Sequence, residues 1–136
     1  MMSTACHTPS EPAAPAALLT KRTALAQVAC CVGCCCGRTD RGFPPVPVER
    51  LKEVWKREKL NRTVQLTISG CLGPCDMANV ILVMTAAGAE WFGGIAEESV
   101  FEDVITWARA CHAAGAVLPL PAPLERHRFR RFAEVA

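Results

Sequence analysis

The cysteines of this 136-residue chain are not spread evenly along it. Five of its nine cysteines lie within VACCVGCCCG, residues 28–37, and two more lie in CLGPC, residues 71–75. Small secreted proteins that depend on disulfides usually distribute their cysteines along the chain, whereas tight clusters are typical of metal sites and redox chemistry. The clustering therefore predicts a metal or redox site, provided that the fold brings the two segments together.

Composition and length indicate one folded domain. The chain is long enough for a single hydrophobic core, and its 51% hydrophobic and 21% charged residues are typical of a globular protein. The formal net charge is only +2, and the basic residues are not interleaved with aromatic ones as in a base-stacking surface. We therefore expect no nucleic-acid partner.

The sequence contains no segment typical of membrane insertion or export. No apolar run approaches the ~20 residues needed to cross a bilayer. The short apolar stretch at residues 13–19 is interrupted by Pro15 and has no basic residue before it, unlike a signal peptide. These features predict a cytoplasmic protein with no membrane partner.

Changes in composition divide the chain into three parts. Residues 1–22 are rich in Pro and Ala and predict a flexible extension, in which Cys6 and His7 are assigned no role. Residues 23–115 carry the regular apolar patterns of a domain. Residues 116–136 are first Pro-rich and then basic, and we interpret them as a flexible tail that is either solvated or docks on an acidic partner. The tail contains four closely spaced arginines: Arg126, Arg128, Arg130 and Arg131.

Periodic apolar residues predict the elements of the domain. Alternating patterns predict strands at 23–30, 63–70, 79–85 and 90–95. Apolar stripes at helical spacing predict helices at 48–60 and 96–115, with Trp55 and Cys111 in the core. The order β-α-β-β-β-α predicts a small mixed α/β sheet with helices packed on it. In a right-handed crossover the first two strands are parallel neighbours, so the two cysteine loops are expected at the same edge of the sheet.

Four thiolates from two such loops can hold zinc in a tetrahedron, or a [2Fe-2S] cluster with two thiolates on each iron. Cys71 and Cys75 are separated by three residues, whereas zinc knuckles usually have two, which favours the cluster. A thioredoxin-type redox pair at Cys31 and Cys34 is disfavoured, because glycines and prolines delay the following helix.

The chain also resembles a known family. A strand leading to Cys31, a nearby second cysteine, a helix and then SGCLGPCDMANV resemble the thioredoxin-like [2Fe-2S] ferredoxins over roughly residues 24–113. The resemblance implies a thioredoxin-like fold, a [2Fe-2S] cluster and a one-electron carrier that is not itself an enzyme. It also implies a redox protein donor and acceptor and a homodimer. The implied ligands are Cys31, Cys36, Cys71 and Cys75.

A narrower resemblance concerns CCCGRTDRGFPPVP, LKEVWK and LNRTVQLTISGCLGPCDMANV. These segments look like the small ferredoxin-like proteins associated with bacterial cobalamin biosynthesis, which implies a step that reduces corrin cobalt. Two alternatives stay open for the function: a zinc-stabilised interaction module, and a thiol-disulfide or metal-delivery protein.

The first cysteine cluster leaves its ligands open. Cys35 or Cys34 can replace Cys36, and Cys30 can replace Cys31. A ferric [2Fe-2S] centre with four thiolates is formally a dianion, which nearby donors and cations would offset. Candidates for this role are the amides of the Gly33, Gly37 and Gly73 loops and the side chains of Arg38 and Arg41.

Overall fold

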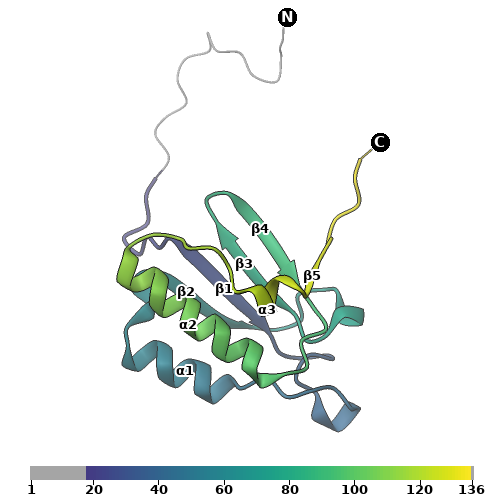
Figure 1. The fold of residues 1–136 in the computed structure, drawn as a ribbon. Helices are drawn as coiled ribbons and strands as arrows, with labels where there is room; N and C mark the ends of the chain where they lie inside the picture. The colour runs from purple at the N-terminus through teal and green to yellow at the C-terminus, as the bar shows by residue number, and fades with distance from the viewer. Residues whose placement is uncertain (1–17, 136) are drawn as a thin grey trace, which may run out of the picture.

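A five-stranded mixed sheet lies at the centre of the computed structural model, which describes residues 18–135 (Figure 1). The predicted extension with Cys6 and His7 lies mostly outside these residues. Across the sheet the strand order is β2-β1-β3-β4-β5. The strands are β1 Ala26–Cys31, β2 Val64–Ser69, β3 Ile81–Thr85, β4 Gly88–Phe92 and β5 Arg128–Phe129.

The first two strands pair in parallel, as predicted from the crossover. Their register places Cys31 of β1 opposite Ser69 of β2, so both strands end at one edge of the sheet. The other pairs, β1 with β3, β3 with β4 and β4 with β5, are antiparallel. A parallel pair flanked by an antiparallel hairpin in this order is the sheet of a thioredoxin-like fold, which confirms the predicted fold class.

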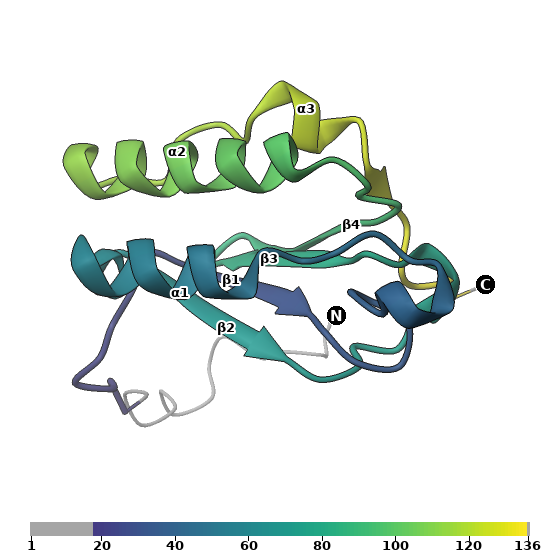
Figure 2. The same cartoon turned by 90° about the horizontal axis from the view of Figure 1, so that it is seen from below.

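The two long helices, α1 Val48–Arg57 and α2 Glu98–Ala114, cover one face of the sheet. They lie side by side in Figures 1 and 2 and are joined by ion pairs, one from Arg50 to Glu102 at 3.0 Å and one from Arg109 to Glu58 at 2.6 Å. No helix in the described part of the chain has the length and apolar character to cross a membrane.

Alternation along the strands builds the core, as the sequence predicted. On β1, Val28 and Cys30 point toward the helices and are fully or almost fully buried. Trp55 of α1 is buried as expected, and its indole N–H donates to the Val64 carbonyl at 2.7 Å. Cys111 of α2 is also buried in this core, where the Leu118 N–H donates to its sulfur at 3.4 Å.

The helix ends follow local backbone chemistry. Gly115 takes the left-handed conformation (φ 65°) and caps α2 through a hydrogen bond from its N–H to the Cys111 carbonyl, as the glycine predicted. The end of α1 differs from the predicted residue 60. It lies at Arg57, because Lys59 adopts φ 55° and starts a separate 3-10 turn, η2 Leu60–Arg62.

The segment after Gly115 differs from the predicted flexible tail. It forms a short helix, α3 Ala122–Glu125, and the strand β5, which pairs with β4. Leu124 is fully buried in the main core, and Phe129 packs against the apolar residues beside the cysteines. Some of the apolar side chains of this segment, among them Leu124 and Phe129, are therefore used for packing.

Candidate metal centre

The two cysteine loops meet at the edge of the sheet where β1 and β2 end. The Val32 N–H donates to the Ser69 carbonyl at 3.0 Å, which continues the strand pairing into the loops. Gly33 lies close to the second loop, since a Cβ at this position would be 3.4 Å from the Cys71 nitrogen. Beyond this contact a narrow cavity, too tight to admit a water molecule, lies between the loops. Its walls are Cys31, Cys35, Cys36, Cys71, Gly73, Pro74, Cys75 and Val80.

The four cysteines proposed as ligands line this cavity as two contacting pairs. The Cys71 and Cys75 sulfurs lie 3.3 Å apart in the second loop. In the first loop the Cys31 and Cys36 side chains are both buried and pack in one cluster with Val80. Each loop therefore presents one pair of thiols to the same space.

Burial and the neighbouring thiols raise the pKa of one cysteine in each pair, Cys36 and Cys75. Burial, together with the hydrogen bond to Cys31, raises the pKa of Cys36 to about 12. The hydrogen bond to Cys71, together with desolvation, raises the pKa of Cys75 to about 12. A metal that binds here must displace these protons, because thiolates are the ligands.

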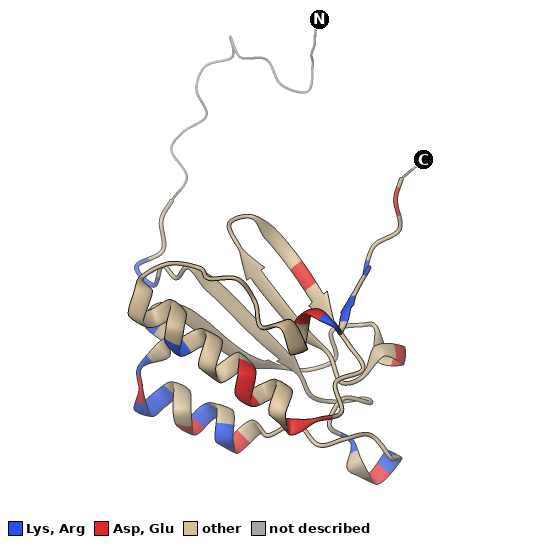
Figure 3. Cartoon of the chain, in the orientation of Figure 1, with Lys and Arg blue, Asp and Glu red and all other residues tan. Residues whose placement is uncertain are grey.

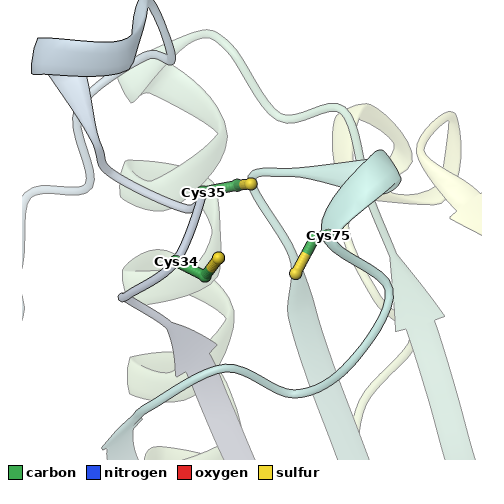
Figure 4. A group of neighbouring side chains, drawn as sticks. All are labelled: Cys34, Cys35 and Cys75. Atoms are coloured by element: carbon green, nitrogen blue, oxygen red, sulfur yellow. The ribbon is translucent and has the colours of Figure 1, made fainter.

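A second group of thiols overlaps the first at Cys75. The sulfurs of Cys34, Cys35 and Cys75 all lie within 4.8 Å of one another (Figure 4). Cys34 is exposed, and Cys35 lines the cavity as well. The described part of the chain therefore contains a cysteine cluster that can bind a metal.

Cys30 lies apart from both groups. Consecutive strand residues point to opposite faces, so Cys30 enters the main core under the helices while Cys31 faces the cavity. Burial raises the pKa of the Cys30 thiol to about 12. Its place in the main core leaves Cys31 as the strand cysteine that reaches the site.

Two of the predicted loop amides, those of Gly33 and Gly37, do not face the sulfurs. The Gly33 N–H donates to the Cys36 carbonyl at 3.0 Å, and the Gly37 N–H donates to the Asn79 side chain at 2.8 Å. These two amides shape the first loop instead. The reason is that a tight loop must satisfy its own backbone groups before it can offer them to a ligand.

Asn79 is a site residue that sequence reasoning missed. It is completely buried, and its Nδ2 donates to the Pro44 carbonyl at 2.8 Å while its Oδ1 accepts from Gly37. One side chain thus ties together the first cysteine loop, the proline segment and the residues that lead into β3. The signal in the sequence was a polar residue directly before the apolar run of 80–83.

The two predicted cations of the first loop have separate roles. Arg38 forms a two-point ion pair with Asp40 at 2.7 and 2.8 Å, which lowers the pKa of that carboxyl to about 2. Arg41 donates to the Cys34 carbonyl at 3.1 Å and so holds the loop backbone. The charge of Arg38 is therefore largely compensated.

An apolar group surrounds the buried thiols. Its buried members are Cys31, Cys36 and Val80, and its partly buried members are Leu72, Met77, Ala78, Trp91 and Phe129. Trp91 and Phe129 come from the paired strands β4 and β5, and their ring centroids are 6.1 Å apart. The predicted tail therefore supplies part of the wall around the site, which the sequence did not indicate.

The fold and the cysteine cluster define this protein as a thioredoxin-like α/β domain with a candidate metal centre. No protein-family model and no curated protein matches the chain. Among solved structures, the chain is similar to the wild-type thioredoxin-like [2Fe-2S] ferredoxin from Aquifex aeolicus. The two share 24% sequence identity, the match covers 80% of this chain and 100% of the other, and the TM-score is 0.41.

Proposed function

We propose that this protein is a one-electron carrier that holds a [2Fe-2S] cluster with Cys31, Cys36, Cys71 and Cys75. The observation that carries the proposal is the arrangement of two contacting thiol pairs on opposite loops of one cavity. A [2Fe-2S] cluster takes two thiolates on each iron, so the donor set fits this group in number and kind.

The cluster, when bound, would take up and release one electron. Cys31 and Cys36 are buried among apolar side chains, whereas Cys71 is exposed. The protein surface therefore approaches the site most closely at the second loop, and we propose that the redox protein donor and acceptor dock there. The chain itself would bind, insulate and orient the centre without acting as an enzyme.

The finer assignment rests on the sequence resemblance. The segments shared with ferredoxin-like proteins of cobalamin biosynthesis support an acceptor that reduces corrin cobalt. A homodimer and a cytoplasmic location belong to the same proposal and stay predictions.

The partly exposed group of Cys34, Cys35 and Cys75 favours a second candidate function. Three thiols within 4.8 Å of one another, with Cys71 next to Cys75, can also hold a soft cation such as zinc near the surface. A zinc-stabilised interaction module or a metal-delivery protein would use these residues.

Anaerobic purification tests the two candidates. The expected protein is red-brown, contains equal amounts of iron and acid-labile sulfide, loses its visible absorption with dithionite and then gives a rhombic EPR signal. A colourless protein with one bound zinc would establish the second candidate and reject the first.

A further inference from the structure

The chain segment after β5 places an arginine on the second cysteine loop. A Cβ atom added to Gly73 would lie 2.7 Å from the Nη2 of Arg131. Gly73 is the middle residue of the loop from Cys71 to Cys75, so the Arg131 guanidinium lies directly against this loop. The absence of a side chain at Gly73 is what leaves room for it.

Aromatic rings hold Arg131 in this position. Its guanidinium carbon lies 5.5 Å from the centre of the Trp91 ring and 5.4 Å from that of Phe132. Trp91 belongs to the apolar group around Cys31 and Cys36. The Arg131 Nε is buried and has no hydrogen-bond partner in the described structure. The side chain is thus fixed by stacking rather than by an acidic partner.

The neighbouring arginines are either paired with acidic residues or exposed to solvent. Arg128 is paired with Glu90 and Glu125, each at 2.7 Å, so its charge is compensated. None of the ion pairs found among residues 18–135 includes Arg131. Arg130 is exposed to solvent. Figure 3 shows these basic residues along the C-terminal segment. Arg131 therefore brings an uncompensated positive charge to the second cysteine loop.

We propose that Arg131 raises the reduction potential of this centre by holding its charge against the Cys71–Cys75 loop. This inference rests on the proposed function. Reduction by a donor protein or by dithionite moves one electron to the site, and no covalent bond forms or breaks. The site then carries one more negative charge, and a cation fixed nearby in a partly desolvated place stabilises this reduced state more than the oxidised one.

An anaerobic redox titration of three variants tests the proposal. Arg131→Gln removes the charge, Arg131→Lys keeps it, and Arg130→Gln removes an exposed charge as a matched control. For Arg131→Gln we expect the ratio of reduced to oxidised protein at a fixed potential to fall about tenfold, which equals about 59 mV for one electron. The potential of Arg131→Lys should stay near that of the wild type. The potential of the control, Arg130→Gln, should also stay near that of the wild type, because solvent and salt screen an exposed charge.

The other outcomes are decisive as well. If wild-type protein contains the cluster and Arg131→Gln has the same potential as Arg130→Gln, this inference is wrong while the proposed function stands. Equal shifts of the reduction potential in Arg131→Gln and Arg131→Lys would mean that packing matters and charge does not. This result would also reject the inference. Arg131→Met serves as a second neutral variant; loss of iron in both neutral variants would show that Arg131 retains the cluster rather than tuning it. Wild-type protein without iron and sulfide would reject the proposed function and this inference together.

Discussion

The backbone N–H of Gly37 donates to the Oδ1 of Asn79 at 2.8 Å, which joins the end of the first cysteine loop to the segment before β3. The two residues are 42 positions apart in the sequence. Cys36, directly before Gly37, is thereby held in the buried position where it contacts Cys31. The location of this thiol thus depends on a neutral amide that binds no ligand itself.

Replacing Asn79 should loosen the first cysteine loop. Asn79→Ala leaves the Gly37 N–H and the Pro44 carbonyl without their partner, and an unsatisfied buried group costs about 1–3 kcal/mol. We expect a lower free energy of unfolding in urea and weaker iron retention. Asn79→Asp keeps the acceptor for Gly37 but loses the donor to Pro44. Equal stability of wild type and Asn79→Ala would contradict this role.

Serine substitutions should separate the ligands from the spare cysteines. Cys36→Ser is expected to lose most of the bound iron and sulfide, because this thiol lies in the buried pair with Cys31. Cys34→Ser and Cys35→Ser should keep the wild-type visible spectrum. The measurement is iron and acid-labile sulfide per protein after anaerobic purification. Loss of the cluster in Cys35→Ser together with its retention in Cys36→Ser would assign the ligand role to Cys35.

Cys30 should affect stability rather than metal binding. Its side chain is 1% exposed within the main core, so Cys30→Ser buries a hydroxyl group in apolar surroundings. The expected loss is about 1–3 kcal/mol in the free energy of unfolding of the metal-free protein. Cys34→Ser, at an exposed position, is the matched control and should be near neutral. Loss of iron from a fully folded Cys30→Ser protein would argue against this assignment.

Gly93 should be intolerant of any side chain. An added Cβ would lie 2.7 Å from the Met77 carbonyl oxygen and 3.0 Å from the Phe129 ring. Gly93→Ala therefore pushes apart the second cysteine loop and β5, and overpacking of this kind costs about 1–3 kcal/mol. At Gly70 an added Cβ meets nothing within 4 Å, so Gly70→Ala should leave thermal stability almost unchanged. Similar melting temperatures for the two variants would contradict the close packing seen here.

The ion pair between Glu58, directly after α1, and Arg109 of α2 should make the free energy of unfolding depend on pH in acid. The two-point hydrogen bond from Arg109, aided by Arg57, lowers the pKa of Glu58 from about 4.5 to about 2. Between pH 4.5 and 2 the unfolded chain binds more protons than the folded chain. The contribution of this ion pair to the free energy of unfolding is therefore complete above pH 4.5 and is lost as the pH falls toward 2. Urea unfolding between pH 2 and 6 should show a shallower slope for Glu58→Gln than for the wild type. Glu49→Gln, exposed on α1, is the control and should keep the wild-type slope.

The sequence by itself determined most of the regular secondary structure of this protein. Alternating apolar residues located the first three strands, helical stripes located α1 and α2, and the crossover rule placed both cysteine loops at one sheet edge. These features could be predicted because each follows from a short-range period or from the handedness of one connection. The spacing of Cys71 and Cys75 likewise identified one of the two thiol pairs as a local unit. The fourth strand was predicted at 90–95 but lies at Gly88–Phe92, because Gly88 pairs with Thr85 instead of forming the turn.

Only the tertiary structure decided which loop residues meet. No periodic pattern predicts which way the side chains of Cys34, Cys35 and Cys36 point. Their loop is shaped instead by hydrogen bonds to distant residues such as Asn79. The same holds for the segment after α2, where Arg131 reaches Gly73 through stacking on Trp91. Contacts of this kind join residues far apart in the sequence, and their geometry exists only once the sheet has brought both partners to the same edge.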